Sequence, residues 1–148
     1  MADQLITGTT LIEDKRSEKG EIWSISGSAF IPNEPDVDDV SYDNNSWGEV
    51  TANTDNIWFN CPVNLPQGAI ITSVIIYGNA AATAETYTLL RNGFAAQTAE
   101  TLATGNIGTP NTTISNATID NNSYHYWIRT STIDTNDIIY GAIIKYRF

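Results

Sequence analysis

The chain has 148 residues, enough for one domain with a hydrophobic core; 41% of them are hydrophobic and 16% are charged. Its 17 acidic residues outnumber 7 basic ones, and the net charge of −10 argues against binding to nucleic acid or to anionic membranes. The single cysteine, Cys61, excludes an internal disulfide, and no stretch is long and apolar enough to predict insertion into a membrane.

The N-terminal segment, residues 1–12, has no basic stretch followed by an apolar one, so we expect no secretory signal peptide. Residues 4–12 predict a first strand, and residues 1–12 could pair with a neighbouring subunit by strand addition. The location of the protein stays open. Without a signal peptide, a virion or an extracellular surface would be reached by a non-classical route.

Alternating residues predict the next strands. In Glu21–Phe30, Trp23, Ile25 and Ala29 are expected to face inward. Residues 31–47 predict a long acidic loop, and loops of this length in compact domains tend to be functional or disordered. A strand over Ile57–Val63 follows, with Trp58 on its outer face.

The stretch Val63–Gly78, VNLPQGAIITSVIIYG, is expected to organise the fold. Pro66 fixes its own φ, and Gly68 can adopt the positive φ that a turn before the next strand needs. Ala69–Tyr77 is then apolar and β-branched, which predicts a strand covered on both faces and disfavours a buried helix.

Further strands are predicted over five later ranges: Glu85–Arg91, Thr98–Thr104, Thr112–Ile119, Ser123–Thr132 and Ile138–Phe148. Asn92-Gly93 predicts a hairpin turn. Nine or ten short strands without an amphipathic helix predict an all-β chain. We expect residues 1–148 to form a single antiparallel two-sheet β-sandwich with jelly-roll topology.

Three motifs resemble a pattern found in many uncharacterised bacterial and metagenomic proteins. They are an "LPxGA" turn leading to a strand that ends in "YG" (residues 65–78), a "TTI-x(4)-IDNxxYxYxI" segment (residues 112–128) and a closing "I-Y-G-x-x-I-x-Y" strand (residues 139–146). The resemblance covers residues 57–148. It implies a β-sandwich module of the kind found in surface, fibre and carbohydrate-associated proteins, and it implies no activity.

The acidic loop carries the candidate metal ligands. Carboxylates are the oxygen ligands that calcium prefers, and the loop offers five: Glu34, Asp36, Asp38, Asp39 and Asp43. The spacing lacks the glycine and the distal glutamate of an EF-hand. The alternative is a solvated acidic loop without an ion, and no other cofactor is expected.

Aromatic side chains are the candidate ligand-binding residues. Tyr42, Trp47, Trp58 and Trp127, together with Tyr126, could form a platform on which sugars stack. The alternative is that these rings pack in the core or between subunits.

The sequence predicts no catalytic residue. His125 is the single histidine, and no G-x-S-x-G nucleophile elbow accompanies it, so a hydrolase is the weakest of three hypotheses. Cys61 is expected to be a buried small hydrophobe.

The leading hypothesis is a non-enzymatic structural protein, a self-associating homo-oligomeric subunit of a virion, fibre or surface layer. The alternative is a carbohydrate-binding module, assisted by calcium, with a glycan as its partner.

Overall fold

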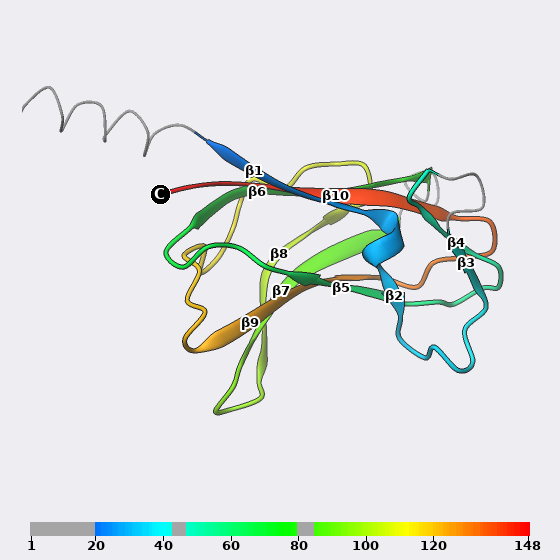
Figure 1. The fold of residues 1–148 in the computed structure, drawn as a ribbon, viewed down its shortest axis with the longest axis horizontal. Coiled ribbons are helices and arrows are strands. Elements are labelled where there is room, and N and C mark those ends of the chain that lie inside the picture. The colour runs from blue at the N-terminus through cyan, green and yellow to red at the C-terminus, as the bar shows by residue number, and fades with distance from the viewer. Residues whose placement is uncertain (1–19, 43–46, 80–84) are drawn as a thin grey trace, which may run out of the picture.

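The structure, a computed structural model, describes residues 20–42, 47–79 and 85–148. The predicted strand over residues 4–12 and the candidate ligand Asp43 lie outside the described residues. The prediction of an all-β, antiparallel two-sheet sandwich is confirmed, with ten strands in two layers (Figure 1). No helix in these ranges is long and apolar enough to cross a membrane.

Two five-stranded sheets form the layers. Sheet A contains β1 (Glu21–Ser26), β3 (Val40–Tyr42), β4 (Val50–Ala52), β6 (Ile70–Gly78) and β10 (Ile138–Arg147). Sheet B has the order β2 (Ile31–Pro32), β5 (Phe59–Val63), β9 (Tyr124–Thr130), β7 (Thr86–Gly93) and β8 (Ala99–Asn106). A single 3₁₀ turn, η1 (Gly27–Ala29), follows β1.

The chain changes sheet repeatedly, for example from β4 to β5, from β5 to β6 and from β6 to β7, as the predicted jelly-roll topology requires. The centre of sheet A is β10. It pairs with β6 along one edge, and with β1 and then β4 along the other. The stretch expected to organise the fold, β6, is therefore the neighbour of the central strand.

The predictions that Cys61 is buried and that Trp58 lies on an outer face are confirmed. Phe59 and Cys61 on β5 and Tyr87 and Leu89 on β7 are fully buried, while Trp58 is exposed. Trp23 and Ile25 of β1 pack against the same core. Because side chains alternate along a strand, each of these strands presents a second, outward row of residues.

The prediction of a strand over Thr112–Ile119 is wrong. The segment is irregular and contacts both sheets: Thr118 forms a single bridge to Ile70 of β6, and Ser115 N–H donates to Leu102 O of β8. Asn116 has a φ of 48°. A chain that crosses from one sheet to the other cannot follow the ladder of one neighbouring strand.

The predictions of one turn and of one long loop also need correction. Asn92 and Gly93 continue β7, because both pair with β9 opposite His125 and Tyr124, and the turn comes at residues 94–97. The range 31–47, predicted to be one long acidic loop, contains β2 and β3, which pair with β5 and β4.

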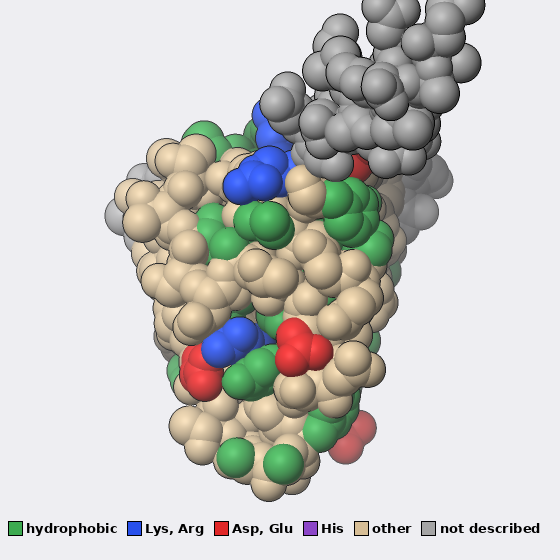
Figure 2. Space-filling model, turned by 90° about the vertical axis from the view of Figure 1, so that its left-hand side faces the viewer, with side chains coloured by type: hydrophobic (Ala, Val, Ile, Leu, Met, Phe, Trp, Pro, Cys, Tyr) green, Lys and Arg blue, Asp and Glu red, His purple; other side chains and the backbone are tan. Residues whose placement is uncertain are grey.

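Figure 2 shows the end of the sandwich at which β10 ends. Hydrophobic side chains form small separate areas there, among polar side chains and backbone, and acidic and basic side chains lie near one another. Among the described residues visible from this side, there is no broad apolar area of the kind that large permanent interfaces bury.

The hydroxyl of Tyr87 joins the two sheets. Its oxygen lies 2.9 Å from the carbonyl oxygen of Val74, on β6 in sheet A, and 2.7 Å from that of Thr109. A Cβ atom on Gly105 would lie 2.5 Å from this hydroxyl oxygen, so glycine is required there. Burial raises the pKa of Tyr87 to about 12.

We expect Tyr87→Phe to lower the free energy of unfolding by about 1–3 kcal/mol at pH 7, because the ring stays packed while a buried hydrogen bond is lost. Above pH 10 the unfolded tyrosine ionises before the folded one, so wild-type stability should fall between about pH 10 and 12. The decrease in stability that comes from Tyr87 ionisation should be absent from Tyr87→Phe. Urea unfolding across this pH range measures both effects.

Exposed Tyr77 provides the matched control, since Tyr77→Phe removes a hydroxyl outside the core. Its effect should stay within about 0.5 kcal/mol. Equal effects of the two substitutions would contradict a role for Tyr87 in joining the sheets.

Candidate functional site

The outer face of sheet B carries the candidate site. Along β9, Tyr126, Ile128 and Thr130 face the core, so the residues that alternate with them point outward: His125, Trp127 and Arg129. On the neighbouring strand β5, Pro62 lies opposite Trp127, and Asn60 lies opposite Arg129.

Three rings form a continuous row on this face, which we call the aromatic row: Phe94, His125 and Trp127. The ring centroids of Phe94 and His125 are 5.2 Å apart, and those of His125 and Trp127 are 5.5 Å apart with planes 23° from parallel. These spacings lie within the range for favourable aromatic contact. The contacts fix the orientation of His125 by stacking.

The aromatic row borders a cavity with a volume of about 540 Å³, which we call the larger cavity. Its remaining walls combine rings with side-chain amides. The amides belong to Asn60, Asn64 and Asn121, and the further rings belong to Tyr124 and Tyr126. Such a surface offers flat apolar faces together with hydrogen-bond donors and acceptors.

The loop that carries Asn121 is held by the turn before β6. Asn121 N–H donates to Gln67 Oε1 at 2.7 Å, and Asn121 Nδ2 donates to Leu65 O at 2.9 Å. Asp120 N–H donates to the hydroxyl of Tyr126 at 2.9 Å. Hydrogen bonds from Ser123, and also from Asn122 and Gln67, lower the pKa of the Asp120 carboxyl. The cavity wall is therefore fixed before any ligand arrives.

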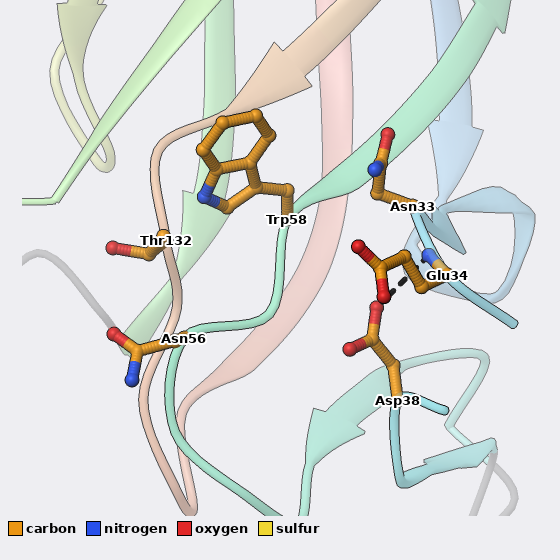
Figure 3. A pocket seen from close by; sticks show the side chains of 6 residues that line it. All are labelled: Asn33, Glu34, Asp38, Asn56, Trp58 and Thr132. Atoms are coloured by element: carbon orange, nitrogen blue, oxygen red, sulfur yellow. Dashed lines mark hydrogen bonds between the residues drawn. The ribbon is translucent and has the colours of Figure 1, made fainter.

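A smaller cavity of about 350 Å³ lies beside Trp58, just before β5 (Figure 3). Glu34 and Asp38 line one side of it, and Asn56 and Thr132 line the other. Trp58 is 40% exposed, and the guanidinium carbon of Arg129 lies 4.2 Å from the centre of its ring.

The turn before Trp58 is pinned by one carboxylate. Asp55 Oδ1 accepts hydrogen bonds from the backbone N–H of Thr135 at 2.9 Å and from its hydroxyl at 2.8 Å, and these bonds lower the pKa of Asp55. The next residue, Asn56, has a φ of 64°, which asparagine tolerates better than most residues.

The four predicted ligand-binding aromatics lie in different places. Trp127 belongs to the larger cavity, and Trp58 belongs to the smaller one. Trp47 is 75% exposed and lines neither cavity. Tyr42 ends β3 in sheet A, where its hydroxyl donates to Phe30 O at 3.0 Å.

Sequence reasoning left Phe94, Asn60, Asn64 and Asn121 out of the site. It also grouped Tyr126 with the exposed aromatics, whereas Tyr126 is 4% exposed and presents only part of its surface to the cavity. The alternation on β9 was a usable signal for His125, since that residue shares a face with Trp127.

The predicted calcium ligands of the acidic loop also lie in different places. Glu34 and Asp38 line the smaller cavity, and Asp38 Oδ2 accepts a hydrogen bond from Glu34 N–H at 3.0 Å. Asp39 Oδ1 accepts one from Asn53 Nδ2 at 2.9 Å, and Asp36 is exposed.

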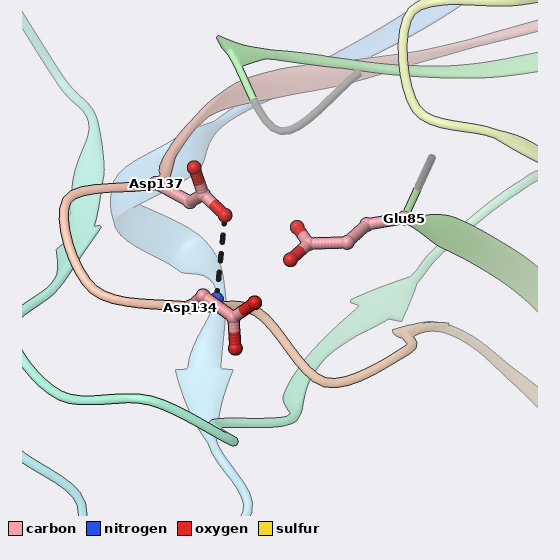
Figure 4. A group of neighbouring side chains, drawn as sticks. All are labelled: Glu85, Asp134 and Asp137. Atoms are coloured by element: carbon pink, nitrogen blue, oxygen red, sulfur yellow. Dashed lines mark hydrogen bonds between the residues drawn. The ribbon is translucent and has the colours of Figure 1, made fainter. Parts of the chain in front are cut away.

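A second group of carboxylates was not predicted (Figure 4). Ligand atoms of Glu85, Asp134 and Asp137 lie within 4.8 Å of one another, and Asp134 N–H donates to Asp137 Oδ2 at 3.3 Å. Glu85 is buried, whereas Asp134 is exposed. Among the described residues, these three side chains are the ones whose ligand atoms lie close enough together to share one ion.

No family model and no curated protein matches the sequence. The fold is similar to several solved structures. One is the C-terminal CBM6 of LamC, a marine laminarinase from Zobellia galactanivorans, with 14% identity, a TM-score of 0.47 and coverage of 84% of this chain and 98% of that chain.

A second is a GH26-CBM35 β-(1,4)-mannanase from Podospora anserina, with 12% identity, a TM-score of 0.46 and coverage of 86% of this chain and 28% of that chain. A third is TmCBM61 in complex with β-1,4-galactotriose, with 12% identity, a TM-score of 0.38 and coverage of 93% of this chain and 94% of that chain. The TM-scores of all three are below 0.5.

Cys61 is fully buried behind this face, as the sequence indicated. Burial raises the pKa of its thiol to about 11, so the reactive thiolate is scarce at pH 8 and shielded from solvent. We expect the folded protein to resist alkylation by iodoacetamide and the protein in guanidinium chloride to be modified fully, as measured by intact mass. Rapid modification of the folded protein would contradict this burial.

Proposed function

We propose that the chain binds a carbohydrate on the outer face of sheet B, without chemically changing it. The observation that carries the proposal is the aromatic row beside three asparagine side chains in the larger cavity. The C–H groups of a sugar ring pack on an aromatic face, while its hydroxyls need both donors and acceptors, which amides supply.

Part of the site is held in place by the fold, which favours binding. His125 and Trp127 belong to a strand with paired neighbours on both sides, and Asn121 is held by Gln67 and Leu65. Little side-chain freedom is left to lose when a ligand arrives, so more of the contact energy appears as affinity.

The carbohydrate hypothesis was the alternative at the level of sequence, and the gathering of rings and amides favours it over self-assembly. The homo-oligomeric virion, fibre or surface-layer subunit stays a prediction, as does a location reached by a non-classical route. At the end of β10, the rings of Tyr146 and Phe148 contact each other edge to face with centroids 5.9 Å apart.

We expect Trp127→Ala to weaken binding of the best ligand by at least about tenfold, because it removes the largest ring of the aromatic row. The ligand is first selected from β-1,3- and β-1,4-linked gluco-, manno-, galacto- and glucosamine oligosaccharides. Isothermal titration calorimetry measures the dissociation constant, and circular dichroism confirms folding.

Trp47→Ala is the matched control, since this exposed tryptophan lines neither cavity and its loss should change affinity less than about twofold. A loss of binding in Trp47→Ala with normal binding in Trp127→Ala would place the ligand elsewhere and contradict the proposal. Absence of binding to every oligosaccharide tested would overturn it.

That calcium assists the binding also stays a prediction. It can be tested because carboxylates gather in two places, at Glu34 and Asp38 in one group and at Glu85, Asp134 and Asp137 in the other. We expect calcium to raise the melting temperature, because a ligand that binds only the folded state stabilises it. Comparing Asp137→Asn with Asp38→Asn shows which group is responsible, since only the substitution at the binding group should abolish the rise. The same melting temperature in calcium and in chelator would refute calcium binding.

A further inference from the structure

We propose that the smaller cavity beside Trp58 binds the protonated amino group of an amino sugar, so that the glycan preferred by this protein carries free amines. This inference rests on the proposed function, because it takes the glycan to lie on the outer face of sheet B. It adds the chemical class of the ligand.

The cavity combines the two features that recognise such a group. Trp58 supplies an aromatic wall, and Glu34 and Asp38 supply carboxylates across from Asn56 and Thr132 (Figure 3). An amino sugar presents an apolar ring face next to a compact cation. The face can pack on the indole, while the ammonium donates charge-assisted hydrogen bonds to the carboxylates.

Among the described residues, no cation forms an ion pair with these carboxylates. In the part of the chain that the structure describes, the one ion pair joins Arg91 and Glu100, away from this cavity. Asp38 accepts a backbone hydrogen bond from Glu34, which leaves further lone pairs on both carboxylates. The positive group nearest the ring, Arg129, packs on Trp58 and is absent from the lining of the cavity.

The two cavities are neighbours along one strand. Trp58 lines the smaller cavity and Pro62 the larger, and four residues of extended chain span about 13 Å. Asn60, from the larger cavity, donates to Asn33 Oδ1 of the smaller one at 3.4 Å. An oligosaccharide lying along β5 can therefore contact the aromatic row with one part and the carboxylates with another.

The net charge of −10 acts in the same direction, since it attracts a polycationic glycan and repels one that carries uronic acids or sulfates. Acetylation of the amine removes the charge and adds bulk. We therefore expect discrimination between free and N-acetylated amines, and salt should reduce it by screening.

The experiment compares glucosamine oligomers with N-acetylglucosamine oligomers of the same length and linkage, titrated into the protein at low salt and pH 6. We expect the free amines to bind at least about tenfold tighter. The double variant Glu34→Gln, Asp38→Asn should lose this preference. Each single substitution should reduce it, which covers the case in which the double variant fails to fold.

Asp36→Asn is the matched control, because it removes one negative charge from the same loop at an exposed residue outside the cavity. It should keep the preference. If it abolishes the preference as fully as Asp38→Asn does, the effect comes from overall charge and the cavity is not the amine site.

The other outcomes separate the two proposals. Equal affinity for free and acetylated oligomers, with binding still lost in Trp127→Ala, overturns the amine site and leaves the proposed function intact. Absence of binding to any oligosaccharide overturns both. Displacement of the glucosamine oligomer by calcium chloride, but not by sodium chloride of equal ionic strength, identifies the cavity as a divalent-cation site and overturns the amine assignment.

Discussion

The spacing of the two sheets depends on one buried hydroxyl. Tyr87 reaches from sheet B to the carbonyl of Val74 in sheet A and to that of Thr109 in the connection between the sheets, and Gly105 leaves the space that the ring needs. A buried hydroxyl without a partner is costly, so these contacts favour the arrangement in which the layers face each other. Because the inner faces of the strands are fixed in this way, the alternation of side chains along β9 places three residues on the outer face: His125, Trp127 and Arg129.

The sequence motifs that suggested a β-sandwich module hold each other in place. Gly68 N–H donates to Ile119 O, and Ile119 N–H donates to Ala69 O, so the "LPxGA" turn pairs with the isoleucine of "IDN". Gln67 and Leu65 then bind Asn121. These residues support the wall of the larger cavity, which explains how motifs without chemistry of their own contribute to a binding surface.

Charge and aromaticity are the two properties on which the proposed binding rests. The acidic surplus disfavours phosphate-bearing partners, while exposed rings offer apolar faces of the kind on which neutral or cationic sugars pack. The two cavities divide these roles. Amides and the three rings of the aromatic row line the larger cavity, and two carboxylates face Trp58 in the smaller one.

The sequence by itself determined the fold class, most of the strands and the two faces of each, because alternation and β-branching are local properties of the chain. It placed Trp58 on an outer face and Cys61 inside. It failed over Thr112–Ile119, where contacts to both sheets override local propensity. Only the tertiary structure decided which outward residues meet. Phe94 contacts His125, and Glu34 faces Trp58, because strand pairing brings together residues far apart in the chain, and no periodicity within one segment encodes that pairing.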